Sequence, residues 1–221
     1  MAHELKGLYA ITRESKGDTA RLIGDVQAAL QGGVRILQYR DKSNNPILRK
    51  QEARKLLELC RNYSALLIIN DDLKLAADIG AHGIHLGKHD ADLNTARSQL
   101  GRQAIIGISC YNQLTCANKA QQEGANYIAF GSFFPSPTKP AASPAQISLL
   151  QNWKNQTTPV CAIGGIRLNR AATLIEAGAD MLAIISNLWD SDNIQEQARA
   201  YSQLWPRRLS ENRRRSEGGP F

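Results

Sequence analysis

Eight short apolar runs, each followed by a longer stretch with helical periodicity, dominate this sequence. The runs cover residues 7–12, 35–42, 65–71, 83–87, 104–109, 127–133, 159–165 and 181–186. They are rich in Ile, Val and Leu and mostly lack the alternation of polar and apolar residues that a half-solvated strand shows. Strands of this kind are buried on both faces, as in a parallel sheet that is covered by helices.

The stretches between the runs predict helices over residues 18–31, 46–62, 72–79, 92–100, 112–123, 144–152, 168–177 and 192–205. Asp18 and Asn112 are expected to be N-caps, and Pro46 suits a first helical turn. Gly80 and Gly178 each stand shortly before the next run, where a glycine fits the end of a helix. The chain therefore predicts eight repeated strand–helix units.

Eight such units in a chain of 221 residues predict an α/β fold, a single (β/α)8 TIM barrel. The alternative is a doubly wound open sheet, which needs a glycine-rich first turn between strand and helix. The first turn here reads Thr12-Arg13-Glu14-Ser15 and contains no glycine. We expect residues 1–206 to form this one barrel domain.

The formal net charge of +7 is unevenly distributed. The segment 207–221 contains five Arg and two Glu and carries a net charge of +3, and we expect it to be a disordered tail that the barrel does not need. A basic protein can bind nucleic acid or anionic small molecules. Aromatic residues make up 6% of the chain and do not alternate with the basic ones, so we expect small-molecule partners and no nucleic acid.

Three features predict the cellular compartment. No apolar stretch is long enough to span a bilayer, so no membrane association is expected. The N-terminal residues lack the apolar core of a signal peptide, and the four cysteines form no C-x-x-C pair and are expected to be reduced thiols. We therefore predict a cytoplasmic protein, and we leave open whether it forms a homo-oligomer.

Polar residues at the ends of the runs are the candidates for function, because a TIM barrel builds its active site at the C-terminal ends of its strands. Gln38, Arg40 and Lys42 share one face of the second run, because side chains alternate along a strand. If that face lines the barrel, one amide and two cations meet at its mouth. This pattern indicates an anion site.

Carboxylates follow the third and fourth runs. Asp72 suits a helix cap, which leaves Asn70 and Asp71 for the mouth, and Asp90 follows the next run. Neighbouring strands lie about 4.8 Å apart, so Asp71 and Asp90 could hold one ion between them. Two carboxylates without a nearby cysteine suit Mg²⁺ that is completed by phosphate oxygens and water. The alternative is a zinc site from His85, His89 and Asp90.

The later runs add hydroxyls, glycines and a lysine. Ser109 ends the fifth run, and Lys139 lies in the proline-rich loop 133–140 after the sixth. Gly164 and Gly165 end the seventh run, and Ser186 ends the eighth. The loops after these two strands form the usual phosphate site of a TIM barrel. No Ser-His-Asp or Cys-His arrangement is apparent, so the site is organised to stabilise phosphate charge.

In combination, these segments resemble the thiamine phosphate synthase family. The similarity is carried in order by residues 38–42, 70–71, 85–87 with Asp90, 107–109, 134–139 and 162–166. It extends from about Gly7 to Ser186 and implies that the barrel is the catalytic domain of a transferase. Ser136 stands where the family more often has Thr, which keeps the hydroxyl, and Pro137 lies between two hydroxyls.

The family joins a pyrimidine diphosphate to a thiazole phosphate and releases pyrophosphate. The resemblance implies that the pyrimidine diphosphate is bound by Gln38, Tyr39, Arg40, Asp41, Lys42, Asn70, Ser109 and Lys139. It implies that the thiazole phosphate is bound by Ser136, Pro137, Thr138, Gly165, Ile185 and Ser186. Among these, the residues expected to be catalytic are Arg40, Lys42, Ser109 and Lys139. Asp71 and Asp90 are expected to hold the cofactor Mg²⁺.

Two other functions are weighed against synthesis of thiamine phosphate. A thiazole phosphate tautomerase of the same barrel family would not need the residues for diphosphate and Mg²⁺, which are present here. A non-catalytic sensor of thiamine precursors would be expected to have lost charges at the mouth, and none is lost. The sequence leaves open whether the thiazole substrate is carboxylated.

Overall fold

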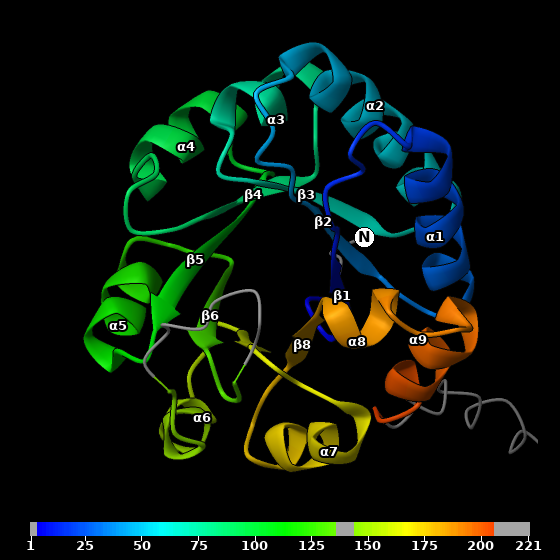
Figure 1. The fold of residues 1–221 in the computed structure, drawn as a ribbon. Helices are drawn as coiled ribbons and strands as arrows, with labels where there is room; N and C mark the ends of the chain where they lie inside the picture. The colour runs from blue at the N-terminus through cyan, green and yellow to red at the C-terminus, as the bar shows by residue number, and fades with distance from the viewer. Residues whose placement is uncertain (1–3, 136–143, 206–221) are drawn as a thin grey trace, which may run out of the picture.

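The computed structural model describes residues 4–135 and 144–205 of the chain. Its parallel strands close into one barrel in the order β1 to β8, and β8 pairs with β1. Figure 1 shows the helices arranged around the strands. The strands are β1 (Gly7–Ile11), β2 (Ile36–Tyr39), β3 (Leu66–Asn70), β4 (Gly83–Leu86), β5 (Ile105–Tyr111), β6 (Tyr127–Gly131), β7 (Val160–Ile163) and β8 (Met181–Ile184). The predicted (β/α)8 barrel is thereby confirmed.

A helix follows each strand. The helices are α1 (Thr19–Gln31), α2 (Pro46–Asn62), α3 (Leu73–Ile79), α4 (Leu93–Leu100), α5 (Leu114–Gln122), α6 (Ser148–Trp153), α7 (Leu168–Glu176), the short α8 (Ser186–Trp189) and α9 (Ile194–Ser202). Helix α8 lies between β8 and α9 and was not predicted, because four residues are too few for a helical period to show in a sequence. None of the helices in the described ranges is both long and apolar enough to cross a membrane.

Two apolar layers hold the barrel together. One lies between the strands and the helices and includes Leu37, Leu67 and Phe130. The other fills the inside of the barrel and includes Ile36 and Ile68. Neighbouring residues of one strand belong to different layers, because side chains alternate across a sheet. This packing explains why the runs are apolar without alternation.

Most of the predicted caps are confirmed, and one is wrong. The side chain of Asp18 accepts from the backbone N–H of Arg21, and Pro46 is the first residue of α2. Asn112 is not a cap: helix α5 begins later, after Gln113, whose side chain makes no capping hydrogen bond. The reason is that β5 continues to Tyr111, with an irregularity in its pairing to β6 that follows Ser109.

Glycine at position 107 is required by the ring that it faces inside the barrel. A Cβ atom at Gly107 would lie 1.9 Å from Cζ of Tyr127. We expect Gly107→Ala to lower the free energy of unfolding by about 1–3 kcal/mol or more, because the packed ring has no room to move. Urea unfolding measures this loss.

The matched control is Gly24→Ala in helix α1. No atom lies within 4 Å of a Cβ atom built at Gly24, and alanine favours a helix over glycine by up to about 1 kcal/mol. This control should therefore be as stable as the wild-type protein or more stable. Equal stability of Gly107→Ala and the wild type would contradict the packing argument.

Candidate active site

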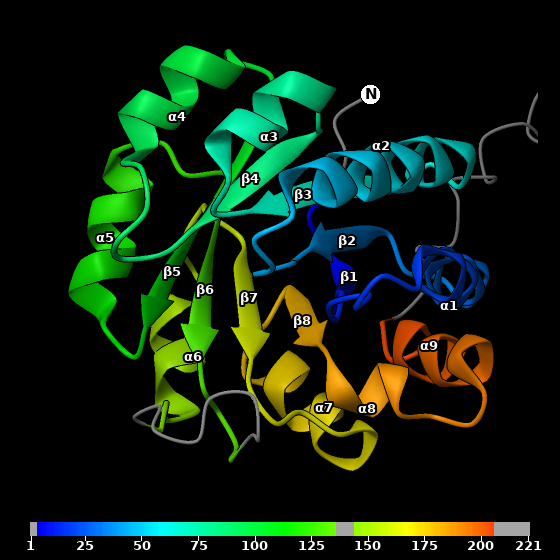
Figure 2. The ribbon, with the colours of Figure 1, turned by 45° about the horizontal axis from the view of Figure 1, so that its top comes forward.

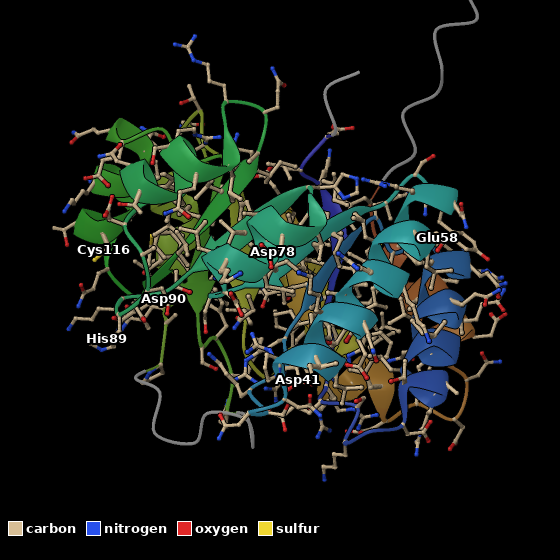
Figure 3. The ribbon with its side chains drawn as sticks, turned by 90° about the horizontal axis from the view of Figure 1, so that it is seen from above. Asp41, Glu58, Asp78, His89, Asp90 and Cys116 are labelled. Atoms are coloured by element: carbon tan, nitrogen blue, oxygen red, sulfur yellow. The ribbon has the colours of Figure 1, made fainter. Side chains whose placement is uncertain are left out.

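The strands of the closed barrel are all parallel, so their C-terminal ends lie at one end of it, and Figure 2 shows the arrowheads of β5, β6 and β7 pointing the same way. Figure 3 shows Asp41, His89 and Asp90 toward the same end of the molecule. Asp41 follows β2, and Asp90 follows β4. The structure therefore brings the loops that carry the predicted site residues to one mouth.

Asp71 and Asp90 meet at this mouth. Asp71 follows β3 with a left-handed backbone (φ 61°), and its N–H donates to the carbonyl oxygen of His85 at 3.0 Å. Oδ2 of Asp90 accepts from the backbone N–H of Gly87 at 2.6 Å. Asp90 and Asn70 both help to lower the pKa of Asp71, so their side chains lie close to its carboxyl group. The strand register and these loop contacts thus place two carboxyl groups side by side.

The two carboxyl groups titrate differently. Burial would raise the pKa of Asp71, but hydrogen bonds from Lys42 and Asp90 hold it below its ordinary value. Burial raises the pKa of Asp90 most, and the neighbouring Asp71 raises it further. The hydrogen bond from the Gly87 N–H acts in the opposite direction. Of the two carboxyl groups, Asp90 is therefore the one that takes up a proton more readily. Two carboxylates this close repel each other unless a proton or a cation lies between them, which is the property of a site for a hard divalent ion.

Two cations follow β2 at the same mouth. The ammonium group of Lys42 forms an ion pair with Asp71. The backbone of Arg40 is held by Thr12, whose hydroxyl accepts from the Arg40 N–H at 2.9 Å. Its guanidinium group forms no hydrogen bond or ion pair within residues 4–135 and 144–205. Arg40 can therefore serve an anion that enters the mouth.

The strand that precedes these cations points its side chains in two directions. Nε2 of Gln38 lies inside the barrel and donates to the hydroxyl of Tyr9 at 2.9 Å. The side chain of Tyr39 lies in the outer layer, where its hydroxyl donates to Glu52 of α2 at 2.7 Å. Asp41 is buried and accepts from the backbone N–H of Ser43 at 2.6 Å. The side chain of Tyr39 therefore points away from the inside of the barrel.

Ser109 faces His85 from the neighbouring strand, with 2.9 Å between Oγ and Nε2. The other ring nitrogen of His85 lies 3.0 Å from the hydroxyl of Tyr127, which in turn lies 2.8 Å from the hydroxyl of Tyr9. Sequence reasoning assigned no role to either tyrosine. A signal was available, because each tyrosine lies in an apolar run at a position whose side chain faces the inside of the barrel.

The ends of β7 and β8 form the other side of the mouth. Gly165 has a left-handed backbone (φ 59°), and a Cβ atom there would lie 2.3 Å from the carbonyl oxygen of Pro135. The glycine therefore lets the segment after β6 approach closely. Ile185 precedes helix α8, and Ser186 is its first residue. Ser136, Pro137, Thr138 and Lys139 lie outside the described residues, as does the predicted tail 207–221.

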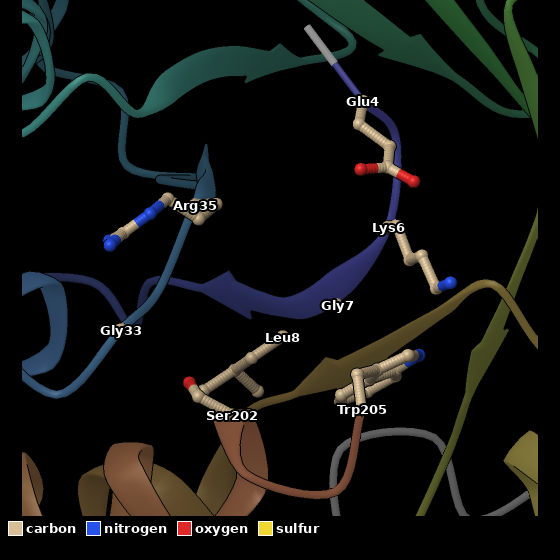
Figure 4. A pocket seen from close by; sticks show the side chains of 8 residues that line it. All are labelled: Glu4, Lys6, Gly7, Leu8, Gly33, Arg35, Ser202 and Trp205. Atoms are coloured by element: carbon tan, nitrogen blue, oxygen red, sulfur yellow. The ribbon is translucent and has the colours of Figure 1, made fainter. Parts of the chain in front are cut away.

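The alternatives to this mouth are a zinc site and a hollow at the other end of the barrel. Within the described ranges, no three side chains of His, Cys, Asp or Glu gather around a common point, so the zinc alternative finds no support in the structure. A hollow of ≈ 250 Å³ lies at the opposite end of the barrel, where Lys6, Arg35 and Trp205 line it (Figure 4). That end of a TIM barrel serves stability, not catalysis.

Comparisons with known proteins show the family of the chain. A model of the family described as "Thiamine monophosphate synthase" matches residues 8–188. The chain is 49% identical to a thiamine-phosphate synthase of Thiobacillus denitrificans over 200 residues, which cover 90% of this chain and 94% of the relative. It is 46% identical to a protein of the same name from Thioalkalivibrio sulfidiphilus, over 91% of this chain and 96% of that one.

The fold has a matching solved structure. It is a thiamine phosphate pyrophosphorylase from Pyrococcus furiosus, with a TM-score of 0.80 and 28% sequence identity. The match covers 91% of this chain and 96% of the other. Sequence and structure thus point to the same group of proteins.

Proposed function

Since the chain belongs to the thiamine monophosphate synthase family, we propose that its barrel mouth joins a pyrimidine diphosphate to a thiazole phosphate. The substrates are 4-amino-2-methyl-5-(diphosphooxymethyl)pyrimidine and 4-methyl-5-(2-phosphoethyl)thiazole, or the 2-carboxy form of the latter. The products are thiamine phosphate and pyrophosphate. The observation that carries this proposal is the pair Asp71–Asp90 beside Lys42 and Arg40.

This arrangement suits a diphosphate that arrives with Mg²⁺. Carboxylate oxygens are the protein ligands that Mg²⁺ prefers, and it commonly shares such a site with phosphate oxygens of the substrate. We propose Asp71 and Asp90 as the residues that hold it. When bound, Mg²⁺ would neutralise charge on the diphosphate.

The reaction breaks the bond between the methylene carbon and the diphosphate oxygen, and forms a bond from that carbon to the thiazole nitrogen. Arg40, Lys42 and Lys139 are proposed to stabilise the negative charge that grows on the departing diphosphate. The aminopyrimidine ring is electron-rich and can carry the positive charge that remains, which favours a dissociative path. The attacking nitrogen uses a lone pair, so no general base is required.

The second phosphate is assigned to the opposite side of the mouth. Gly165 and Ser186 follow β7 and β8, where TIM barrels commonly bind phosphate. Ile185 and the segment Ser136–Thr138 complete this proposed subsite. A thiazole phosphate tautomerase would need only this half of the mouth. The carboxylates and cations on the other half therefore favour the synthase, and so do the names of the relatives.

The proposed compartment is the cytoplasm. All four cysteines are free thiols, three of them buried. Free thiols are typical of proteins in a reducing compartment.

One incubation tests the proposed function. The purified protein is mixed with the two substrates and Mg²⁺, and the products are separated by chromatography. We expect thiamine phosphate and pyrophosphate in equal amounts, and neither product when one substrate or Mg²⁺ is left out. Isomerisation of the thiazole phosphate without coupling would instead support the tautomerase.

A further inference from the structure

A chain of hydrogen bonds crosses the inside of the barrel. It connects five side chains from five strands: Gln38, Tyr9, Tyr127, His85 and Ser109, in this order. Each donor–acceptor distance along it lies between 2.8 and 3.0 Å. One end of the chain, Ser109, and the other, Gln38, are both residues of the proposed substrate site.

The direction of this chain follows from its first member. The group of Gln38 that faces Tyr9 is the amide nitrogen, which can only donate. The Tyr9 hydroxyl therefore accepts from Gln38. Tyr127 is then the only acceptor bonded to this buried hydroxyl within the described residues, so we assign the proton of Tyr9 to the bond with Tyr127. By the same argument we assign the proton of Tyr127 to the bond with Nδ1 of His85, and this arrangement requires the ring to carry its proton on Nε2.

Two further observations support this chain of hydrogen bonds: the hydroxyls keep their protons, and the rings are held in place. Burial raises the pKa of Tyr9 and of Tyr127, so each hydroxyl keeps its proton at neutral pH. The rings are also held firmly, because Tyr127 packs edge-on against Tyr9 at 5.9 Å and stacks on His85 at 5.6 Å. Gly107 leaves the space that the Tyr127 ring fills.

We infer that this chain is a one-way relay, in which every hydroxyl donates toward His85 and holds it as the Nε2–H tautomer. The Ser109 hydroxyl then accepts from His85 and directs its own proton to a ligand at the mouth. The hydroxyl of Ser109 has no other hydrogen bond within the described ranges. Tyr9 and Tyr127 are therefore positioning residues, which act on the ligand only through His85 and Ser109. The atom that accepts the proton of Ser109 is an oxygen or a ring nitrogen of the pyrimidine diphosphate. This assignment rests on the proposed function.

The tautomer can be measured without any substrate. In the wild-type protein, with heavy nitrogen in its histidines, NMR should show Nε2 of His85 protonated and Nδ1 unprotonated. The spectrum of His85→Gln identifies the signals among those of the four histidines. A protonated Nδ1 in the wild type would overturn the inferred direction of the relay.

Two substitutions test what sets the tautomer. Gln38→Met removes the amide nitrogen that can only donate, and Tyr127→Phe removes the hydroxyl that faces Nδ1 of His85. In both variants we expect the His85 signals to become those of a mixture of tautomers. An unchanged tautomer in both would refute the relay, whatever the activity of the variants.

Turnover gives the second readout. Tyr127→Phe should lower kcat by about tenfold, the size of one misdirected hydrogen bond, and leave the Kd of the thiazole phosphate unchanged. The control is Tyr63→Phe, which removes a tyrosine hydroxyl that bonds to Gln31 outside the barrel, and should keep full activity. If Tyr127→Phe turns over like the wild type, Tyr127 does not position the site. A wild type with the expected tautomer but no coupling activity would contradict the proposed function and not the relay.

Discussion

The substitution Asp71→Asn is expected to lower the Mg²⁺-dependent turnover of the protein by about 10²-fold or more. The amide keeps the shape of the carboxyl group but removes the negative charge that would hold the ion with Asp90. It also leaves Lys42 without its ion-pair partner. The measurement is the steady-state rate over a range of Mg²⁺ concentrations, together with the circular dichroism of the variant, which should show an intact fold.

The matched control for this variant is Asp78→Asn. Asp78 lies on helix α3 and is also an aspartate paired with lysines, Lys50 and Lys74, but it follows no strand end. Figure 3 shows it away from Asp41 and His89. We expect wild-type turnover from this control. Full activity of Asp71→Asn at limiting Mg²⁺ would remove the assignment of Asp71 as a metal ligand.

The substitution Lys139→Ala is expected to cut the coupling rate by about 10²-fold or more. The loss of one group that stabilises a developing charge typically costs a few kcal/mol of transition-state stabilisation, and about 1.4 kcal/mol corresponds to one factor of ten. Binding of the thiazole phosphate, which we assign to Gly165 and Ser186, should change much less. Single-turnover rates and equilibrium titrations with each substrate measure the two effects separately.

The control for Lys139 is Lys119→Ala. Lys119 is an exposed lysine of helix α5 that forms an ion pair with Glu123 at the surface, and a pair of that kind contributes little to stability. The variant should bind and turn over like the wild type. The assignment of Lys139 fails if its removal abolishes binding of the thiazole phosphate yet leaves binding of the pyrimidine diphosphate untouched.

The barrel itself was predictable from local patterns. Buried parallel strands have no solvated face, so they appear as continuous apolar runs, and the helices between them end at recognisable caps such as Asp18. The same patterns misplaced the start of α5, because the extent of β5 depends on its pairing with β6 and not on its own residues. Local chemistry thus predicts that an element exists more reliably than where it ends.

The proposed site was likewise predictable in one respect and not in another. The charged residues after the strands could be found in the sequence, because Asp71 and Asp90 follow apolar runs, and charge at such a place has few structural uses. The orientation of each side chain could not be found in the sequence. Tyr39 and Gln38 are neighbours in one apolar run, yet one bonds to helix α2 and the other to the inside of the barrel.

The sequence alone was therefore enough to predict the strand–helix repeat, the barrel, and the acidic and basic residues of its mouth. Closure of the barrel decided which side chains meet. Tyr9 and Tyr127 are 118 residues apart in the chain, and only the closed sheet brings their hydroxyls within 2.8 Å. Hydrogen bonds depend on distances of a few tenths of an ångström, which the register of all the strands sets together. The periodicity of a single strand contains no such information.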